Sequence, residues 1–318
     1  MGNNLRIMIG HDDSDRADAA IDDLWRAGMP RYADAMVVSV AEGWLVAQLK
    51  GDKREAGRLS EQGGAATAAR RATVDPVKEA QHWAVRARER ILSYFSEWNV
   101  ACHTASGSPP REILRKAMEW QPDIIILGAK GQSVLSGFPL GSVSQKIVNE
   151  ANCSVRVARG VPWKESSPVR IVIGVDGRPN SAWAVDAVAS RPWPPQSEVR
   201  VVTVIDSMAQ IAPALQFPGW APGYDRPAGL AFVDAALNQL AEAELIVSSK
   251  VENGDPKQVL VAAAQDWGAE CIFIGSSCDD AGLETRLLGS VSTAVVARAH
   301  CSVEVVRRLQ ESSEFRRI

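Results

Sequence analysis

The chain is organised around one stretch, Asp123-Ile-Ile-Ile-Leu-Gly128-Ala-Lys-Gly131-Gln-Ser-Val-Leu-Ser-Gly-Phe-Pro-Leu-Gly141-Ser-Val-Ser144. Its apolar start, residues 123–127, predicts a short buried strand. The glycines are spaced to wrap a loop around phosphates, because glycine permits positive φ and lets backbone N–H groups approach an anion closely. Residues 142–144 predict the start of a helix, whose N-terminus favours negative charge. The stretch is therefore a candidate nucleotide triphosphate site.

The same pattern occurs twice, so the chain is a duplication. The matching segments are Ile7 to Asp12 with Ile171 to Asp176, Gly107 to Pro109 with Gly254 to Pro256, Ile124 to Gly128 with Cys271 to Gly275, Leu140 to Ser144 with Leu288 to Ser292, and Cys153 to Val155 with Cys301 to Val303. The offset between the copies falls from 164 at Asp12 to 147 at Gly128, so the first half carries 17 extra residues near positions 48–75. Two domains of one fold are expected.

Strands and helices alternate along each half. In the first half, short apolar strands are predicted at residues 6–9, 35–40, 100–104, 123–127 and 154–158. Helix starts are predicted at Ser14-Asp15, Asp75-Pro76, Ser108-Pro109 and Asp255-Pro256, with the first helix ending at Gly28 and the second near Trp98. This alternation predicts an α/β protein in which each half is a doubly wound parallel sheet with helices on both faces.

The two halves meet at a segment with the composition of a linker. Residues 160–168 combine Gly, two Pro and polar residues, which places the boundary near Ser166. The predicted organisation is a first domain over residues 1–160, a linker over 161–168, a second domain over 169–310 and a tail over 311–318.

The composition argues against several classes of protein. The chain has 318 residues and a formal net charge of -3, which argues against binding nucleic acid through bulk charge. No apolar run approaches the roughly 18 residues of a membrane span, and Met1 to Ile9 lack the pattern of a signal peptide. Five cysteines in a chain of this length do not make a disulfide framework, so a cytoplasmic protein is expected, with Cys153 and Cys301 filling core space.

Taken together, the repeated segments resemble the tandem form of the universal stress protein family. Nucleotide-binding members of that family carry a G-x2-G-x9-G-[ST] motif, which the first half fits at Gly128, Gly131, Gly141 and Ser142. The resemblance covers nearly the whole chain. It implies two Rossmann-like domains in tandem, with ATP bound by the first one, often together with Mg or Mn.

The resemblance also implies roles for single residues. Asp12, the aspartate after the first strand, would contact the ribose and adenosine side, and the backbone of Val40 at the end of the second strand would contact adenine. The residues that would surround the ribose and phosphates are Gly128, Gly131, Gln132, Gly141, Ser142, Val143 and Ser144. Independently of this resemblance, no metal-ligand cluster is visible in the sequence.

The second half departs from the motif. Cys278 stands at the position of the second glycine, and ten residues instead of nine precede the Gly-Ser pair. Residues 275–292 carry a formal charge of -2, whereas residues 128–148 carry +2. Because acidic groups near a phosphate loop repel the ligand, we expect one competent site, in the first half, and a structural or regulatory pseudo-site in the second.

Some of these features have simpler explanations that stay open. The glycine loop could be a tight strand-to-helix connection that only needs positive φ. Asp12 could cap the helix that follows it, as could Asp13 or Ser14. His11, which precedes Asp12, is expected to be a surface histidine.

The sequence as a whole predicts a protein that binds an adenine nucleotide and acts in stress response or signalling. ATP is the expected ligand, with AMP, ADP and cyclic AMP as alternatives. The chain lacks the Gly-Lys-Ser/Thr of a P-loop and a convincing nucleophile elbow, so at most weak ATP hydrolysis is expected. A slow Mg-dependent ATPase and a nucleotide-free interaction scaffold stay open as alternative functions.

The expected partners are an adenine nucleotide and an unidentified protein, with no nucleic acid and no membrane. The last strands of the two halves, residues 154–158 and 302–306, are expected to pair within one chain, which would cover sheet edges that otherwise invite aggregation. A homodimer stays open.

Overall fold

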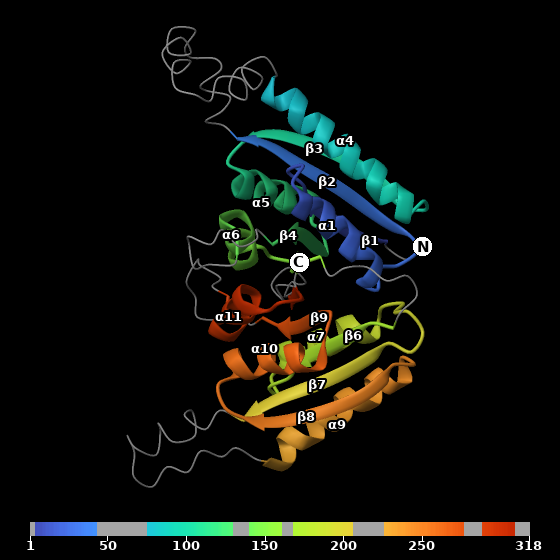
Figure 1. Cartoon of the computed structure of the whole chain (residues 1–318), viewed down its shortest axis with the longest axis vertical. Coiled ribbons are helices and arrows are strands. Elements are labelled where there is room, and N and C mark those ends of the chain that lie inside the picture. The colour runs from blue at the N-terminus through green and yellow to red at the C-terminus, as the bar shows by residue number, and fades with distance from the viewer. Residues whose placement is uncertain are drawn as a thin grey trace, which may run out of the picture.

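The computed structural model describes residues 4–42, 75–129, 140–160, 168–205, 226–276 and 288–308. The two halves follow the same order of strands and helices and lie at the two ends of an elongated molecule (Figure 1). The first half contains β1 (Leu5–Gly10), α1 (Asp15–Asp23), the 3-10 helix η1 (Leu24–Arg26), β2 (Ala33–Glu42), α4 (Pro76–Tyr94), β3 (Asn99–Gly107), α5 (Pro109–Trp120), β4 (Ile124–Gly128), α6 (Ser142–Glu150) and β5 (Ser154–Ala158). The second half contains β6 (Arg170–Gly174), α7 (Pro179–Ala189), β7 (Glu198–Ile205), α9 (Arg226–Glu242), β8 (Ile246–Asn253), α10 (Pro256–Trp267), β9 (Cys271–Gly275), α11 (Ser290–Arg298) and β10 (Ser302–Val306).

The helices begin where the sequence places capping residues. The side chain of Ser14 accepts a hydrogen bond from the Ala17 N–H at 3.2 Å, and Asp75 accepts one from the Val77 N–H at 3.0 Å. Each cap satisfies one of the N–H groups that the first turn of a helix leaves without an intrahelical partner. The predicted helix starts are therefore confirmed at these two positions.

The strands form one sheet through both halves, in the order β3-β2-β1-β4-β5-β10-β9-β6-β7-β8. Within each half, neighbouring strands are parallel. β5 and β10 are antiparallel, and they join the two halves at the strands that were expected to pair. The α/β class and the doubly wound parallel sheet predicted from the sequence are thus confirmed.

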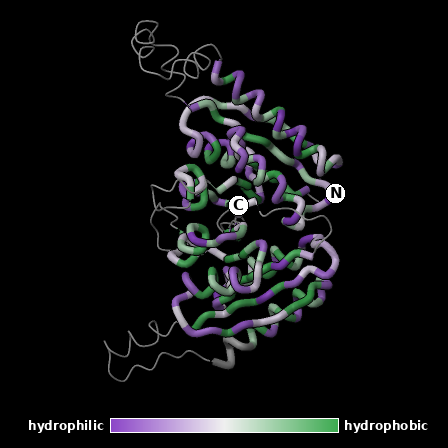
Figure 2. Tube along the Cα trace, viewed as in Figure 1, coloured by the Kyte–Doolittle hydropathy of each residue, from purple (hydrophilic) through white to green (hydrophobic). Residues whose placement is uncertain are grey.

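Helices cover both faces of this sheet. On one face, α5, α6, α10 and α11 pack over an apolar cluster that both halves share. On the other face, α1 with α4 and α7 with α9 cover two separate clusters. Hydrophobic and hydrophilic residues alternate along the helices (Figure 2), as expected for helices with one face against a sheet.

Cys153 and Cys301 lie in the shared cluster with 8% and 0% of their surface exposed, so their prediction as core residues is confirmed. Burial raises the pKa of both thiols to about 12. Of the predicted site, Gly131 and Gln132 lie outside the described residues, as do Cys278 and linker residues 161–167. In the part of the chain that the structure describes, no helix is long and apolar enough to cross a membrane.

Candidate functional site

The candidate site lies where the strand order changes direction. The chain moves outward from β1 through β2 to β3 and then returns to the other side of β1 with β4. In open α/β sheets, ligands bind beyond the carboxyl ends of the strands at such a switch point. Asp12 follows β1, Gly128 ends β4, and Ile9 pairs with Ile126, so Asp12 and Gly128 lie at the same edge of the sheet.

Two helices begin at this edge and are tied to the end of β4. Arg16, in the first turn of α1, donates a hydrogen bond from Nη1 to the Ala129 carbonyl oxygen at 3.1 Å. Ser144, in the first turn of α6, donates from Oγ to the Gly128 carbonyl oxygen at 2.9 Å. The starts of α1 and α6 therefore converge on Gly128 and Ala129.

The N-terminus of α6 is suited to an anion. Its N-cap is Gly141, which has no side chain to occupy the first-turn N–H groups. Ser142 is exposed, and the N–H groups of this turn carry the positive end of the helix dipole. Ser144 is 5% exposed and its hydroxyl is bonded to Gly128, so it positions the helix against the strand.

Packing and capping, and not positive φ, explain the two described glycines of the motif. A Cβ at Gly128 would lie 2.6 Å from the Arg16 carbonyl oxygen, so only glycine lets α1 pack this closely on β4. Gly141 has φ of -69° in its N-cap conformation, and neither glycine is among the described residues with positive φ. Positive φ is therefore not what glycine supplies at these two positions, and Gly131 lies outside the described residues.

Asp12 is exposed and organises the start of α1 indirectly. Its Oδ1 accepts hydrogen bonds from the N–H of Ser14 at 3.3 Å and from its Oγ at 2.6 Å. Ser14, and not Asp12, is the N-cap. Asp12 Oδ2 has no hydrogen-bond partner among the described residues, so this carboxylate still has an oxygen that can accept from a ligand.

His11 is buried, so its expected place at the surface is wrong. It is 4% exposed, with Nε2 lying 3.0 Å from Asp18 Oδ1 and Nδ1 accepting from the Asp13 N–H at 3.3 Å. Asp13 turns back over the ring because it has φ of 58°, a conformation that aspartate tolerates better than most residues. The ring therefore fixes the turn between β1 and α1 that presents Asp12.

The backbone of Val40 faces the space beyond the end of β1, next to Asp12. β2 pairs with β1 up to Val38, whose carbonyl oxygen accepts from the His11 N–H at 3.0 Å. In a parallel sheet, residues two apart on a strand direct their N–H and C=O groups to the same side. Val40 therefore directs its N–H and C=O groups to the same side as Val38 does, into the space beyond the end of β1. β2 continues to Glu42, which places Val40 two residues before the strand ends.

Arg16 is a candidate site residue that was not predicted from the sequence. This side chain brings a positive charge to the end of β4, beside Gly128. The signal was present in the repeat, because the offset of 164 aligns Arg16 with Asn180 in the second half. The first half therefore has a positive charge where the second half has a neutral side chain, and this difference could have identified Arg16 as a candidate site residue.

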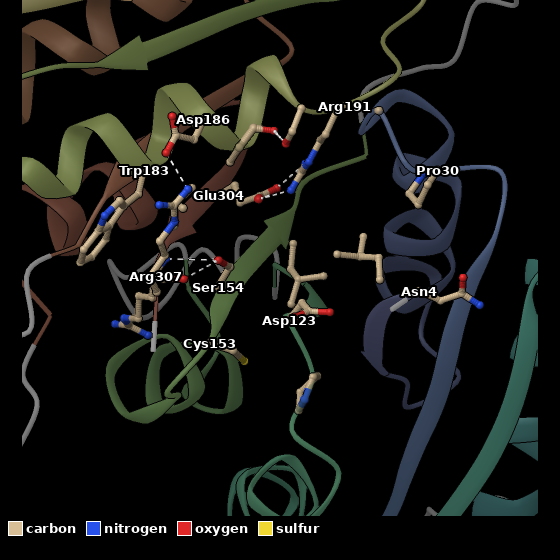
Figure 3. Close-up of a pocket in the computed structure, with 18 of the residues that line it drawn as sticks. Asn4, Pro30, Asp123, Cys153, Ser154, Trp183, Asp186, Arg191, Glu304 and Arg307 are labelled. Atoms are coloured by element: carbon tan, nitrogen blue, oxygen red, sulfur yellow. Dashed lines mark hydrogen bonds and ion pairs between the residues drawn. The ribbon is translucent and has the colours of Figure 1, made fainter. Parts of the chain in front are cut away.

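A cavity of about 900 Å³ lies elsewhere, between the two halves (Figure 3). Asp123 and Cys153, just before β4 and β5, line it together with Trp183 and Asp186 of α7. It therefore lies at the amino ends of these strands, opposite the candidate site. Among the described residues, no group of three or more His, Cys, Asp or Glu side chains could hold a metal ion.

Comparison with known proteins gives one consistent family. A model of the universal stress protein family matches residues 3–159 and 169–307. Universal stress protein MJ0531 of Methanocaldococcus jannaschii is 32% identical over 75 residues, which cover 23% of this chain and 44% of that protein. Universal stress protein Rv2005c of Mycobacterium tuberculosis is 26% identical over 208 residues, which cover 59% of this chain and 63% of that protein. The chain thus spans less than two thirds of the length of these curated relatives.

Solved structures share the fold over nearly the whole chain. A universal stress protein from Archaeoglobus fulgidus superposes with a TM-score of 0.63 and 16% identity, covering 95% of this chain and 98% of that one. A putative universal stress protein from Pseudomonas aeruginosa gives a TM-score of 0.57 and 15% identity, covering 96% and 94%. At these identities the likeness concerns the fold alone.

Proposed function

The chain belongs to the universal stress protein family, and on that premise we propose that its first half binds an adenine nucleotide, with ATP as the main ligand, between the ends of β1 and β4. The observation that carries the proposal is the convergence of the starts of α1 and α6 on Gly128 and Ala129. It brings an arginine and the uncapped N-terminus of a helix to a switch point of the sheet.

Each part of the nucleotide has a matching group. The phosphates would lie at the first turn of α6, where Arg16 adds a positive charge, and Gly131 and Gln132 would complete the loop. The ribose hydroxyls would donate to Asp12, and adenine would meet the backbone of Val40. Mg²⁺ would be held through the phosphates, as is common for this ion.

We propose that this nucleotide acts as a signal in the cytoplasm, in a stress response. Both helices that begin at the site end against the second half. At the end of α1, Asp23 accepts from Ser302 Oγ at 2.7 Å. At the end of α6, Arg307 donates to the carbonyl oxygens of Val148 at 2.6 Å and Ala151 at 2.9 Å. A nucleotide that favours one position of these helices would bias the contacts between the halves.

Thermal unfolding with and without Mg-ATP tests the binding site. A ligand at 100 times its Kd adds about 2.7 kcal/mol to the free energy of unfolding. We expect this stabilisation in the wild-type chain and in Asp176→Ala, which changes the equivalent residue of the second half. Asp12→Ala is expected to lose most of it. Equal stabilisation of both variants, or none in the wild type, would refute the proposed site, and the latter result would favour a nucleotide-free scaffold.

Phosphate release separates a signalling protein from an ATPase. We expect the purified chain with Mg-ATP to release phosphate far more slowly than one turnover per minute. Release at many turnovers per minute that Gly131→Asp abolishes would replace binding with hydrolysis as the function of the site.

A further inference from the structure

The seam between the halves has a local two-fold axis through one residue pair. β5 and β10 run antiparallel with Val157 opposite Val303, Arg156 opposite Glu304 and Val155 opposite Val305. The repeat offset at these strands is 148, so Arg156 and Glu304 are equivalent residues of the two halves. Each therefore faces its own counterpart at the centre of the seam.

The contacts around this axis come in equivalent pairs. Arg307, after β10, caps the end of α6 in the first half. Arg159, after β5, donates to the carbonyl oxygens of Val296 in the last turn of α11 and of Cys301 just before β10 in the second. Ser302 Oγ accepts from the Arg159 N–H at 3.1 Å, as Ser154 Oγ accepts from the Arg307 N–H at 3.2 Å. Contacts of this kind would serve equally well if a half paired with a second copy of itself.

The two residues on the axis, Arg156 and Glu304, are not equivalent in charge. Arg156 and Glu304 are 1% and 0% exposed, and Arg156 Nη1 lies 3.4 Å from Glu304 Oε2. Arg156 Nε also donates to Asp23 Oδ2 at 2.6 Å, and Arg191 Nη1 donates to Glu304 Oε2 at 2.9 Å, so the order Asp23, Arg156, Glu304, Arg191 alternates in charge. We call these four residues the axial ion chain. Figure 3 shows its Arg191 end, where the side chain reaches Glu304 beside the cavity.

The repeat supplies no equivalents for the outer two members. Asp23 aligns with Ala187, and Arg191 aligns with Ala27, whose carbonyl oxygen accepts from Arg191 Nη1 at 3.0 Å. Each half therefore contributes one acid and one base, and only the pairing of unlike halves puts them in alternating order. Two first halves would place Arg156 against Arg156, and two second halves would place Glu304 against Glu304.

We propose that the axial ion chain selects the partner of the β5 edge, which is β10 of the same chain and not β5 of a second copy. Like charges that are buried opposite each other are strongly unfavourable, because desolvation is not offset by attraction. The apolar and backbone contacts of the seam supply its stability, and the ion chain supplies its specificity. The linker adds to this preference, because it raises the effective concentration of β10 near β5.

The test uses two full-length variants with opposite defects. Glu304→Arg puts two arginines on the axis, and Arg156→Glu puts two glutamates there. When the two variants are refolded together, β5 of the first chain can meet β10 of the second and restore the native charge order. We expect sedimentation velocity to show a two-chain species in the mixture and a single-chain species for the wild type. A mixture with no more two-chain species than either variant alone would overturn the proposal, as would wild-type chains that pair through this seam.

A matched control separates charge from packing. Val305→Ala removes an apolar contact at the neighbouring position of the seam. It is expected to lower the Tm, but mixing it with either charge-reversal variant should give no two-chain species beyond what that variant forms alone. A two-chain species in such a mixture would mean that any weakening of the seam allows exchange, and would overturn the proposal.

Neutral variants keep the proposal testable if the charge-reversed chains do not fold. Breaking a buried pair by removing one partner leaves an uncompensated charge, so Arg156→Gln and Glu304→Gln should each lower the Tm by about 10 °C. The double variant should lose clearly less than the sum of the two, because neither Arg156 nor Glu304 is then left buried opposite an uncharged residue, while Asp23 and Arg191 each lose the same partner as in one of the single variants. Additive losses would show that Arg156 and Glu304 do not recognise each other, and would overturn the proposal.

Discussion

Gly128 at the end of β4 and Gly275 at the end of β9 occupy equivalent places in the two halves. A Cβ would lie 2.6 Å from the Arg16 carbonyl oxygen at the first and 1.9 Å from the Asn180 carbonyl oxygen at the second. Glycine is therefore required for packing in both halves, whatever either one binds. The difference that bears on a ligand lies in the neighbouring side chain, which is Arg16 in one half and Asn180 in the other.

The two aspartates after β1 and β6 differ in the same sense. In both, Oδ1 accepts from the N–H two residues further on, that of Ser14 at 3.3 Å and that of Arg178 at 3.1 Å, but only Asp176 has a basic side chain beside its Oδ2, with Arg178 Nε at 3.7 Å. Arg178 thus competes for the carboxylate that a ribose would need. A glycine pattern can thus persist in a duplicated domain for packing alone, and the proposed assignment of the ligand to the first half rests on the adjacent polar residues.

Adding a methyl group at either glycine is expected to have the largest effect. Gly128→Ala should lower the free energy of unfolding by about 2 kcal/mol, and Gly275→Ala by more, because its contact is with backbone at a shorter distance. Urea unfolding measures both. If Gly128→Ala kept full stability and lost only nucleotide binding, the glycine would serve the ligand and not the packing.

Exchanging the neighbouring side chains should have the next largest effect, on binding alone. Arg16→Asn, which gives the first half the residue of the second, is expected to weaken ATP binding about tenfold, or about 1.4 kcal/mol. Asn180→Arg is the matched control and should create no second site. Isothermal titration calorimetry gives the affinity and the number of sites together. An Asn180→Arg chain that binds two nucleotides would show that one charge is all the second half lacks.

A smaller effect is expected from the two arginines that cap helices across the seam. Arg307 holds the end of α6, which begins at the candidate site, and Arg159 holds the last turn of α11, which begins at the equivalent place in the second half. Arg307→Met should change ATP affinity about threefold, or about 0.7 kcal/mol, a modest coupling between the halves. Arg159→Met should leave it unchanged. If Arg307→Met and Arg159→Met bind ATP with equal affinity, α6 does not couple the nucleotide site to the contact between the halves.

The smallest effect concerns pH. Burial, with Lys116 and Arg115 nearby, lowers the pKa of His103 on β3. An unfolded histidine has a pKa of about 6.5. As the pH falls through this value, the His103 side chain takes up a proton in the unfolded chain before it does so in the folded chain. The contribution of His103 to the free energy of unfolding should be constant above about pH 7 and fall as pH drops through 6.5.

Urea unfolding at several pH values measures this decline, which His103→Gln should reduce. Lys250 occupies the equivalent place on β8, and Lys250→Gln should leave the decline unchanged. A decline that persists in full without His103 would assign it to other groups.

Local sequence patterns predicted the elements but not all of their ends. The repeat and the capping residues gave the strand and helix order and the start of α4 at Pro76. The helix ends at Tyr94 and not near Trp98, because Phe95 leaves the helical conformation and its ring stacks on Trp98 with centroids 4.1 Å apart. Such an end depends on a contact between side chains, which helical periodicity does not encode.

The candidate site was also predictable only where it depends on local sequence patterns and not on contacts between distant side chains. Asp12 lies shortly after one strand and Gly128 ends another in a repeated motif, so their place at one edge of the sheet follows from the topology. The burial of His11 depends on Asp18 and on the turn at Asp13, and no local pattern distinguishes it from a surface histidine. The axial ion chain joins residues separated by more than 100 positions, so it appears only when the two halves are brought together.

Mass spectrometry of the nucleotide that remains bound to freshly purified full-length protein tests whether the first half alone holds an adenine nucleotide. Native spectra give the number of nucleotides per chain, and denatured extracts give their identity. One adenine nucleotide per chain, lost in Asp12→Ala and retained in Asp176→Ala, is the predicted result. Two nucleotides per chain, or one that is lost in Asp176→Ala and retained in Asp12→Ala, would contradict the assignment of the site to the first half.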